Sequence, residues 1–380
     1  MTGDVGRLLR YCTDERRWLE HLVERLVRCE SPSTDKAAVD RLADLVGGEL
    51  AALGARVERL PQSGVGDHVR AEVGDGPTQV LLLGHLDTVW PVGQLDRMPL
   101  RAEAGRLYGP GVFDMKAGIA LAMLALRALG QLGLHGRRRA VLLLTSDEEI
   151  GSGASRARIE TEADRSSAVL VLEPALPGGG VKTSRKGVGE YRVEARGVAA
   201  HAGIEPERGI SAITEIAHQV LALEQLQDVK RGVTITVGRI EGGTRTNVVP
   251  PHAAIDVDVR VPTREDADFV TEGIGRLAPR LAGASLSVTG GMNRPPLERS
   301  ARVVRLYTAA RGIAAELGRE LGEGGSGGGS DGNFTGARGV PTLDGLGAIG
   351  GGAHAADEHV ELEPLPWRAA LVAGLILRVP

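Results

Sequence analysis

The chain has 380 residues, which exceeds the size that a single hydrophobic core usually supports, so two domains are the first expectation. The net charge of −4 gives no basic stripe for nucleic acid and no polybasic arm for a membrane surface, and the 3% of aromatic residues argues against base stacking. No apolar run is long enough to span a bilayer, so a small-molecule or peptide substrate is favoured.

The N-terminal region predicts two amphipathic helices. Residues 14–28 repeat apolar side chains at helical spacing, and residues 37–53 form a second helix that Gly54 stops. Cys12 and Cys29 lie on or beside the first helix, where two thiols give no disulfide framework. The same region lacks the three-part pattern of a signal peptide, so we expect a reducing, cytoplasmic location.

Buried strands then alternate with helices, which is the signature of a mostly parallel α/β sheet. The apolar run of residues 80–83 is typical of a strand buried on both faces. The expected strands are residues 57–60, 69–73, 79–84, 140–145 and 168–172, and the expected helices are residues 115–132, 152–161, 301–317 and 365–377.

Beyond residue 181 the pattern changes to that of a small α+β sandwich. The expected strands are residues 189–196, 233–239, 253–261 and 285–289, and the expected helices are residues 210–226 and 264–281. This order suggests a ferredoxin-like domain over residues 184–295, inserted into a catalytic domain of residues 1–183 and 296–380. The apolar faces of the insertion exceed what one thin layer covers, so pairing with a second copy is expected.

Polar residues follow the strand at residues 79–84. Gly84 lets backbone approach closely, and His85 and Asp87, two residues apart, point the same way along an extended chain. This geometry suits a metal-binding imidazole whose second nitrogen is held by a carboxylate. A satisfied polar pair at a sheet edge is the alternative.

Acidic residues recur at other strand ends and turns. Asp114 lies in a glycine-rich turn before a helix, where it is either a ligand or an ordinary N-cap. The strand at 140–145 runs into Asp147, Glu148 and Glu149, which repel one another unless cations or solvent screen them. Glu173 follows the next strand. Because adjacent residues of an extended segment point apart, one of Glu148 and Glu149 is expected to be a ligand and the other a base.

His354 adds a second imidazole, in a glycine-rich loop at 350–358; a lone histidine there is more often structural. The coincidence of these segments favours a metal centre. Two Zn²⁺ ions bring four positive charges, which Asp114, Glu149, Glu173 and a bridging hydroxide neutralise. Each zinc would then have one histidine, one glutamate and a share of Asp114. Co²⁺ and Mn²⁺ remain open as working metals.

Two other enzyme classes fit less well. A dinucleotide enzyme needs G-x-G-x-x-G after a strand, and Gly109-Pro-Gly111 has no third glycine in place. A cysteine hydrolase fails because both cysteines lie far in sequence from the histidine segments. The run of residues 322–329 is either a glycine-rich linker or the approach to a helix N-terminus.

The motifs together resemble the dinuclear zinc metallopeptidase family of glutamate carboxypeptidase, acetylornithine deacetylase, succinyl-diaminopimelate desuccinylase and aminoacylase. The segments that carry the resemblance are residues 84–91, 109–118, 147–153, 173–174, 185–209, 245–251, 327–334 and 350–358. The resemblance implies that His85, Asp114 and Glu173 hold one zinc and that Asp114, Glu149 and His354 hold the other. It also implies Glu148 as general base, Asp87 as the residue that orients His85, and a cis peptide between Asp114 and Met115.

For the insertion, the resemblance implies His201 as an oxyanion stabiliser and Asn247 and Arg260 as contacts of a substrate carboxylate. Residues 327–335 and Asn293-Arg-Pro-Pro296, which contains Arg294, look most like the carboxypeptidase branch. The implied activity is hydrolysis of an amide bond next to a free C-terminal α-carboxylate, in a homodimer whose inserted domain closes as a lid. A deacetylase or desuccinylase of N-acyl amino acids is the alternative, and a catalytically inactive binding relative is a third.

Overall fold

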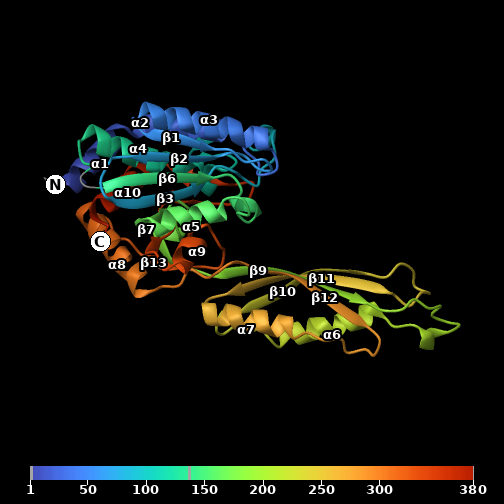
Figure 1. Ribbon diagram of the computed structural model, residues 1–380. Helices are drawn as coiled ribbons and strands as arrows, with labels where there is room; N and C mark the ends of the chain where they lie inside the picture. Colours follow the sequence, from blue (N-terminus) through green and yellow to red (C-terminus); the bar gives the residue numbers. More distant parts are fainter. Residues whose placement is uncertain (1–2, 136–137, 380) are drawn as a thin grey trace. The chain divides into compact units, whose positions relative to one another are not determined.

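The computed structural model describes residues 3–135 and 138–379, which form two compact units (Figure 1). The first unit contains the described residues of Met1–Ser184, Arg299–Ser326 and Ser330–Pro380. The second contains Arg185–Glu298 and Gly327–Gly329. No helix among the described residues is long and apolar enough to cross a bilayer.

The first unit is built on a mixed sheet with the strand order β1-β2-β6-β3-β7-β14. The strands are β1 (Arg56–Leu60), β2 (His68–Val73), β3 (Thr78–His85), β6 (Arg138–Thr145), β7 (Ser166–Val171) and β14 (Thr342–Leu343). β6, β3, β7 and β14 run parallel, while β1 and β2 join antiparallel at one edge. The expected α/β fold with a mostly parallel sheet is confirmed.

Helices cover both faces of this sheet, so its central strands are buried on both sides. Val80 and Leu82 of β3 join the core under one set of helices, whereas Leu81 and Leu83 join a second core under another, because successive side chains of a strand point to opposite faces. The first set is α1 (Asp4–Asp14), α2 (Arg16–Arg28), α3 (Lys36–Ala52), α4 (Ala117–Gln131), α8 (Ala301–Glu316) and α10 (Leu365–Arg378), and the second is α5 (Arg156–Asp164) and α9 (Gly332–Ala337). Polar groups can therefore gather only at the strand ends.

The second unit has the βαββαβ order and a separate antiparallel sheet, β10-β11-β9-β12. Its elements are β9 (Gly187–Arg196), α6 (Ala212–Glu224), β10 (Thr234–Gly242), β11 (His252–Val261), α7 (Arg264–Gly275) and β12 (Ser285–Arg294). Ile216 of α6 and Val270 of α7 pack with Val193 and Ile255 of the sheet in one core. This is the strand order of a ferredoxin-like domain, as the sequence predicted.

Several boundaries differ from the prediction. The helix expected at 14–28 is α2, and an additional helix, α1, precedes it. The helix expected at 264–281 ends at Gly275. The helix expected at 152–161 begins only at Arg156, because Asp147 Oδ2 accepts hydrogen bonds from the backbone N–H groups of Ala154 and Ser155 in the preceding turn. These shifts leave the topology unchanged.

Short strands that the sequence analysis missed support the loops around the sheet. β4 (Arg101–Glu103), β5 (Arg106–Tyr108), β15 (Gly350–Gly351) and β16 (His359–Glu361) form one small sheet, and β8 (Val181–Arg185) pairs with β13 (Glu323–Ser326). The glycine-rich run at 322–329 is thus partly a strand. The pairing of β15 with β16 closes the base of the loop that carries His354.

Candidate metal centre

His85, Asp114 and Glu173 meet at the carboxyl end of the central sheet. His85 is the last residue of β3, Glu173 follows β7, and Asp114 lies in the turn before α4. His85 Nε2 is 3.2 Å from Asp114 Oδ1 and 3.6 Å from Glu173 Oε1. The parallel pairing of β3 with β7 brings the histidine and the glutamate together, because parallel strands end at the same edge.

A second imidazole approaches the same aspartate from the glycine-rich loop. His354 Nε2 lies 3.3 Å from Glu149 Oε2 and 3.6 Å from Asp114 Oδ2. The two oxygens of Asp114 thus face different histidines. Each half of the cluster contains one imidazole nitrogen, one glutamate oxygen and one oxygen of Asp114, so Asp114 is common to both halves. The peptide bond between Asp114 and Met115 is cis, which confirms the expectation from the resemblance.

The donor set fits a pair of divalent cations. Glu149 Oε1 is buried and has no hydrogen-bond partner among the described residues, so this carboxylate has one oxygen left to bind a cation. Nitrogen and carboxylate oxygen donors suit zinc. The described residues contain two groups with ligand atoms within 4.8 Å of one another, namely His85 with Asp114 and Glu149, and His85 with Glu148 and Glu173.

The carboxylates hold protons on the histidines when no cation is bound. A hydrogen bond to Glu149 raises the pKa of His354 to about 9, and burial only partly opposes it. Burial lowers the pKa of His85, but hydrogen bonds to Asp114, Asp87 and Glu173 outweigh it and hold the pKa well above its usual value. A cation that binds here must therefore displace protons.

This protonation predicts a pH-dependent contribution of His354 to the stability of the metal-free protein. Because the folded pKa, about 9, exceeds the ordinary 6.5, the contribution is fully present below pH 6.5 and is lost as the pH rises through 9. We expect His354→Gln to lower the denaturation midpoint of the metal-free protein at pH 6 and to leave it unchanged at pH 10. An NMR titration of His354 with a pKa near 6.5 would contradict this assignment.

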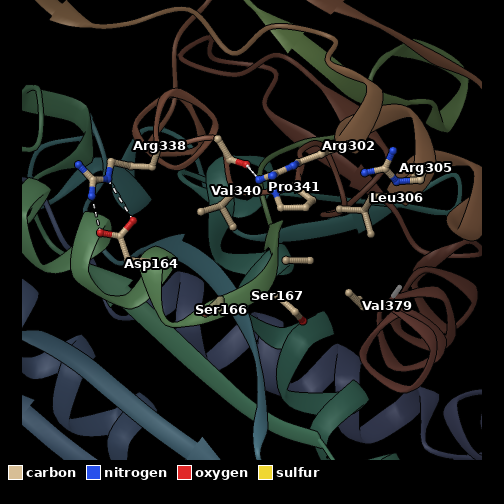
Figure 2. Close-up of a pocket in the computed structure, with 12 residues that line it drawn as sticks. Asp164, Ser166, Ser167, Arg302, Arg305, Leu306, Arg338, Val340, Pro341 and Val379 are labelled. Atoms are coloured by element: carbon tan, nitrogen blue, oxygen red, sulfur yellow. Dashed lines mark hydrogen bonds and ion pairs between the residues drawn. The ribbon is translucent and has the colours of Figure 1, made fainter.

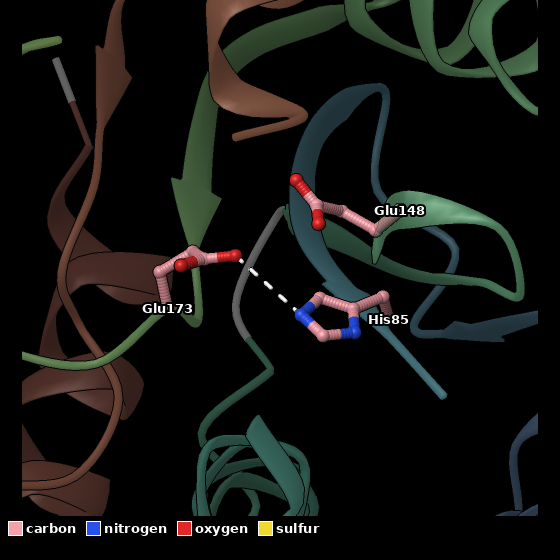
Figure 3. Close-up of side chains that lie close together, drawn as sticks. All are labelled: His85, Glu148 and Glu173. Carbon is pink, nitrogen blue, oxygen red and sulfur yellow. Dashed lines mark ion pairs between the residues drawn. The ribbon is translucent and has the colours of Figure 1, made fainter. Parts of the chain in front are cut away.

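Glu148 lies beside the cluster in a 3₁₀ turn, Glu148–Ile150, and not in an extended segment as expected. Figure 3 shows its carboxylate near His85 and Glu173. Asp87 holds the turn, because its Oδ1 accepts the backbone N–H of Glu148 and its Oδ2 accepts that of Glu149, each at 3.2 Å. The residue expected to orient His85 thus also fixes the two glutamates.

The contact between Asp87 and His85 runs mainly through the backbone. His85 Nδ1 is 2.9 Å from the main-chain carbonyl oxygen of Asp87 and 3.5 Å from its carboxylate. A proton on Nδ1 therefore leaves Nε2 free to bind a cation. The carboxylate of Asp87 is itself held by Ser33, whose hydroxyl donates to Oδ2 at 2.7 Å.

The four candidate residues in the second unit form two separate pairs. His201 and Asn247 lie on neighbouring segments, because the backbone N–H of Ala202 donates to the carbonyl of Asn247. Arg260 and Arg294 both pair with Val188 of β9, from the strands on either side.

The two pairs lie near opposite ends of β9. His201 follows the last residue of β9, Arg196, whereas Arg260 and Arg294 face its second residue, Val188. Eight residues of strand correspond to about 26 Å. One copy of the second unit therefore cannot bring all four side chains to one small substrate.

A separate pocket of about 520 Å³ lies at the other end of β7 and β14 (Figure 2). It is lined by arginines and serines and has one carboxylate, that of Asp164, which Arg338 neutralises through two hydrogen bonds of 3.0 and 2.6 Å. Its lining contains no histidine. This pocket lacks the donors that would hold a metal, and it is distinct from the cluster around His85.

The cysteines offer no nucleophile. Both are free thiols, and Cys12 is buried on α1. Burial raises the pKa of Cys12 to about 12 and also raises that of Cys29. Neither thiol has the lowered pKa that activates the nucleophile of a cysteine hydrolase. The cysteines therefore do not compete with the cluster around His85 as candidate reacting groups.

Two buried charged residues near the metal centre were missed in the sequence. Glu358 follows His354 in the same loop and is fully buried, with backbone N–H groups of the Asp114 turn as its donors. Lys116, also buried, donates to the carbonyl of Cys29 at 2.8 Å. The sequence did offer a signal for Glu358, because it is a charged residue close to a candidate ligand, His354, in a glycine-rich loop.

The fold and the clustered donors define a metal-dependent hydrolase. A model of peptidase family M20/M25/M40 matches residues 81–378. The chain is 30% identical to carboxypeptidase G2 of Pseudomonas sp. (strain RS-16), over 97% of this chain and 91% of the relative. The chain belongs to peptidase family M20/M25/M40.

Other comparisons agree in fold and length. A succinyl-diaminopimelate desuccinylase of Acidovorax ebreus is 30% identical, over 90% of this chain and 94% of the relative. The crystal structure of aminopeptidase PepT from Bacillus cereus superposes with a TM-score of 0.79 at 25% identity, and the match covers 95% of this chain and 98% of that chain. The family is thus shared by relatives whose names indicate different amide substrates.

Proposed function

We propose that the protein hydrolyses the amide bond next to a free C-terminal α-carboxylate, in a short peptide or an N-acyl amino acid. The observation that carries this proposal is the convergence of five donors, with Glu148 beside them, at one end of the sheet. The donors are His85, Asp114, Glu149, Glu173 and His354. The similarity to carboxypeptidase G2 over nearly the whole chain supports the carboxypeptidase branch.

Two zinc ions, or Co²⁺ or Mn²⁺ in their place, would polarise the amide carbonyl and make water a stronger nucleophile at neutral pH. Glu148 then accepts the proton of the attacking water and delivers it to the leaving amine. The carboxylate of Asp87 keeps Glu148 in place by accepting the backbone N–H of Glu148. Arg260 and Arg294 bind the α-carboxylate, with Asn247 as a further contact, and His201 donates to the developing oxyanion.

A panel of substrates tests this proposal. Dipeptides and N-acyl amino acids, varied separately on the two sides of the amide, should be cleaved only when the α-carboxylate is free, and the metal-free protein should be inactive. Equal rates with α-amidated substrates would contradict the proposal. Preference for N-acetyl or N-succinyl substrates over peptides would favour the second candidate, an N-acyl amino acid deacylase, which the desuccinylase relative supports.

The second unit is proposed to act as a dimerisation domain and lid. Exposed apolar residues lie on α6 and on the edge strand β10, among them Leu221 at 59% and Ile240 at 61% exposure. A second copy would cover such a surface. Because His201 and Asn247 lie far from Arg260 and Arg294 within one copy, we propose that one protomer supplies the first pair and its partner supplies the second.

Mixing two inactive variants tests this arrangement. His201→Ala removes the oxyanion donor and Glu148→Ala removes the base, so a hybrid dimer has one intact site only if His201 acts across the dimer. After full subunit exchange we expect about a quarter of the wild-type rate per site, because half of the dimers are hybrids and each has one working site. A mixture as inactive as its components would place His201 in its own protomer's site.

A further inference from the structure

Glu358 is a buried carboxylate whose two oxygens accept four hydrogen bonds. Oε1 accepts the backbone N–H of Phe113 at 2.9 Å and of Asp114 at 3.0 Å, and Oε2 accepts that of Gly111 at 2.9 Å. The fourth donor is the indole Nε1 of Trp90, 2.7 Å from Oε2. All four partners are donors, so the group acts as an ionised carboxylate that only accepts.

These contacts join three segments that carry proposed metal ligands. Trp90 lies five residues after His85, the backbone donors belong to the turn that carries Asp114, and Glu358 itself lies four residues after His354. The main-chain carbonyl of Glu358 also accepts the N–H of Gly109, at 3.2 Å. One side chain therefore links segments that are up to 268 residues apart in the sequence.

The turn held by Glu358 has little freedom of its own. Gly111 has a φ of 69°, in the left-handed region, and a Cβ at this position would lie 2.6 Å from Thr88 Cγ2. Three N–H groups of this turn point to one carboxylate, so their direction and that of Asp114 are set together.

We propose that Glu358 is a positioning residue, which fixes Asp114 so that its two oxygens face His85 and His354 before a metal binds. The inference rests on the proposed function, because it assigns Asp114 to both metals. A carboxylate that only stabilised the fold would affect unfolding but not the affinity of the folded protein for metal. Substitution of residues that hold metal ligands in place commonly weakens metal binding 10- to 100-fold.

The test compares the metal affinity of the folded protein in Glu358→Gln with that of the wild type. Glutamine keeps the shape but presents an amide N–H₂ group to two N–H donors. We expect 10- to 100-fold weaker Zn²⁺ binding in competition with a chelator, and a changed visible absorption spectrum of the Co²⁺-loaded protein. Glu363→Gln is the matched control, because it removes the same charge from an exposed residue five positions further along the chain.

A second variant decides the question if Glu358→Gln does not fold. Trp90→Phe removes one of the four donors and keeps the carboxylate, so we expect about two- to tenfold weaker Zn²⁺ binding. Wild-type affinity and an unchanged Co²⁺ spectrum in the folded variants would overturn the positioning role. If the wild type itself binds no divalent metal, the proposed function fails, and this result is distinguishable from failure of the Glu358 assignment.

Discussion

Glu148→Gln is expected to lower kcat by about 10²–10⁴-fold while the protein keeps both metal ions. The amide matches the carboxylate in size but cannot accept the proton of the attacking water. The carboxylate of Asp87 accepts the backbone N–H of residue 148, and the substitution leaves this N–H in place, so the turn should keep its conformation in the variant. Steady-state kinetics on the best substrate and metal analysis of the same sample measure both quantities.

The outcome also separates Glu148 from its neighbour. The carboxylate of Glu148 lies close enough to His85 and Glu173 to serve as a ligand itself, whereas Glu149 contacts His354. Glu149→Gln is therefore the matched comparison and should lose one metal. If Glu148→Gln lost a metal and Glu149→Gln kept both, the roles of ligand and base would be exchanged.

The ligand-bearing segments could be predicted because their signals are local. A continuous apolar run indicates a strand buried on both faces, and the polar residue directly after it must lie where the strand ends, at the carboxyl end of the sheet. His85 and Glu173 follow from this argument alone. The convergence of His354 on Asp114 does not, because the loop of residues 350–358 has no periodic pattern, and its place came from the family resemblance.

The supporting residues could not be predicted in the same way. Glu358 accepts the backbone N–H of Asp114, which lies 244 residues away in the sequence. Because almost any residue type can donate its backbone N–H, the sequence of the partner segment gives no sign of this contact. The separation of His201 from Arg260 follows from strand register, which pairing across β9 fixes. By contrast, α1 was within reach, since Val5, Leu8 and Cys12 have helical spacing and are buried.

Asp114→Ala should abolish the stabilisation that zinc gives to the protein. Asp114 faces both histidines, at 3.2 Å from His85 and 3.6 Å from His354, so its removal takes a ligand from each metal and leaves two cations with one shared anion fewer. Zinc at 100 times its dissociation constant adds about 2.7 kcal/mol to the free energy of unfolding of a protein with one site. We expect this increment in the wild type and not in the variant.

The metal-free Asp114→Ala protein should unfold below the temperature of the metal-free wild type at neutral pH, because protonated His85 loses its hydrogen bond to Asp114. Thermal unfolding with and without zinc, together with metal analysis after dialysis, measures both effects. Asp96→Ala, which removes an exposed carboxylate outside the cluster, should keep the wild-type response. Two tightly bound zinc ions per chain in Asp114→Ala would show that this aspartate does not bridge the metals.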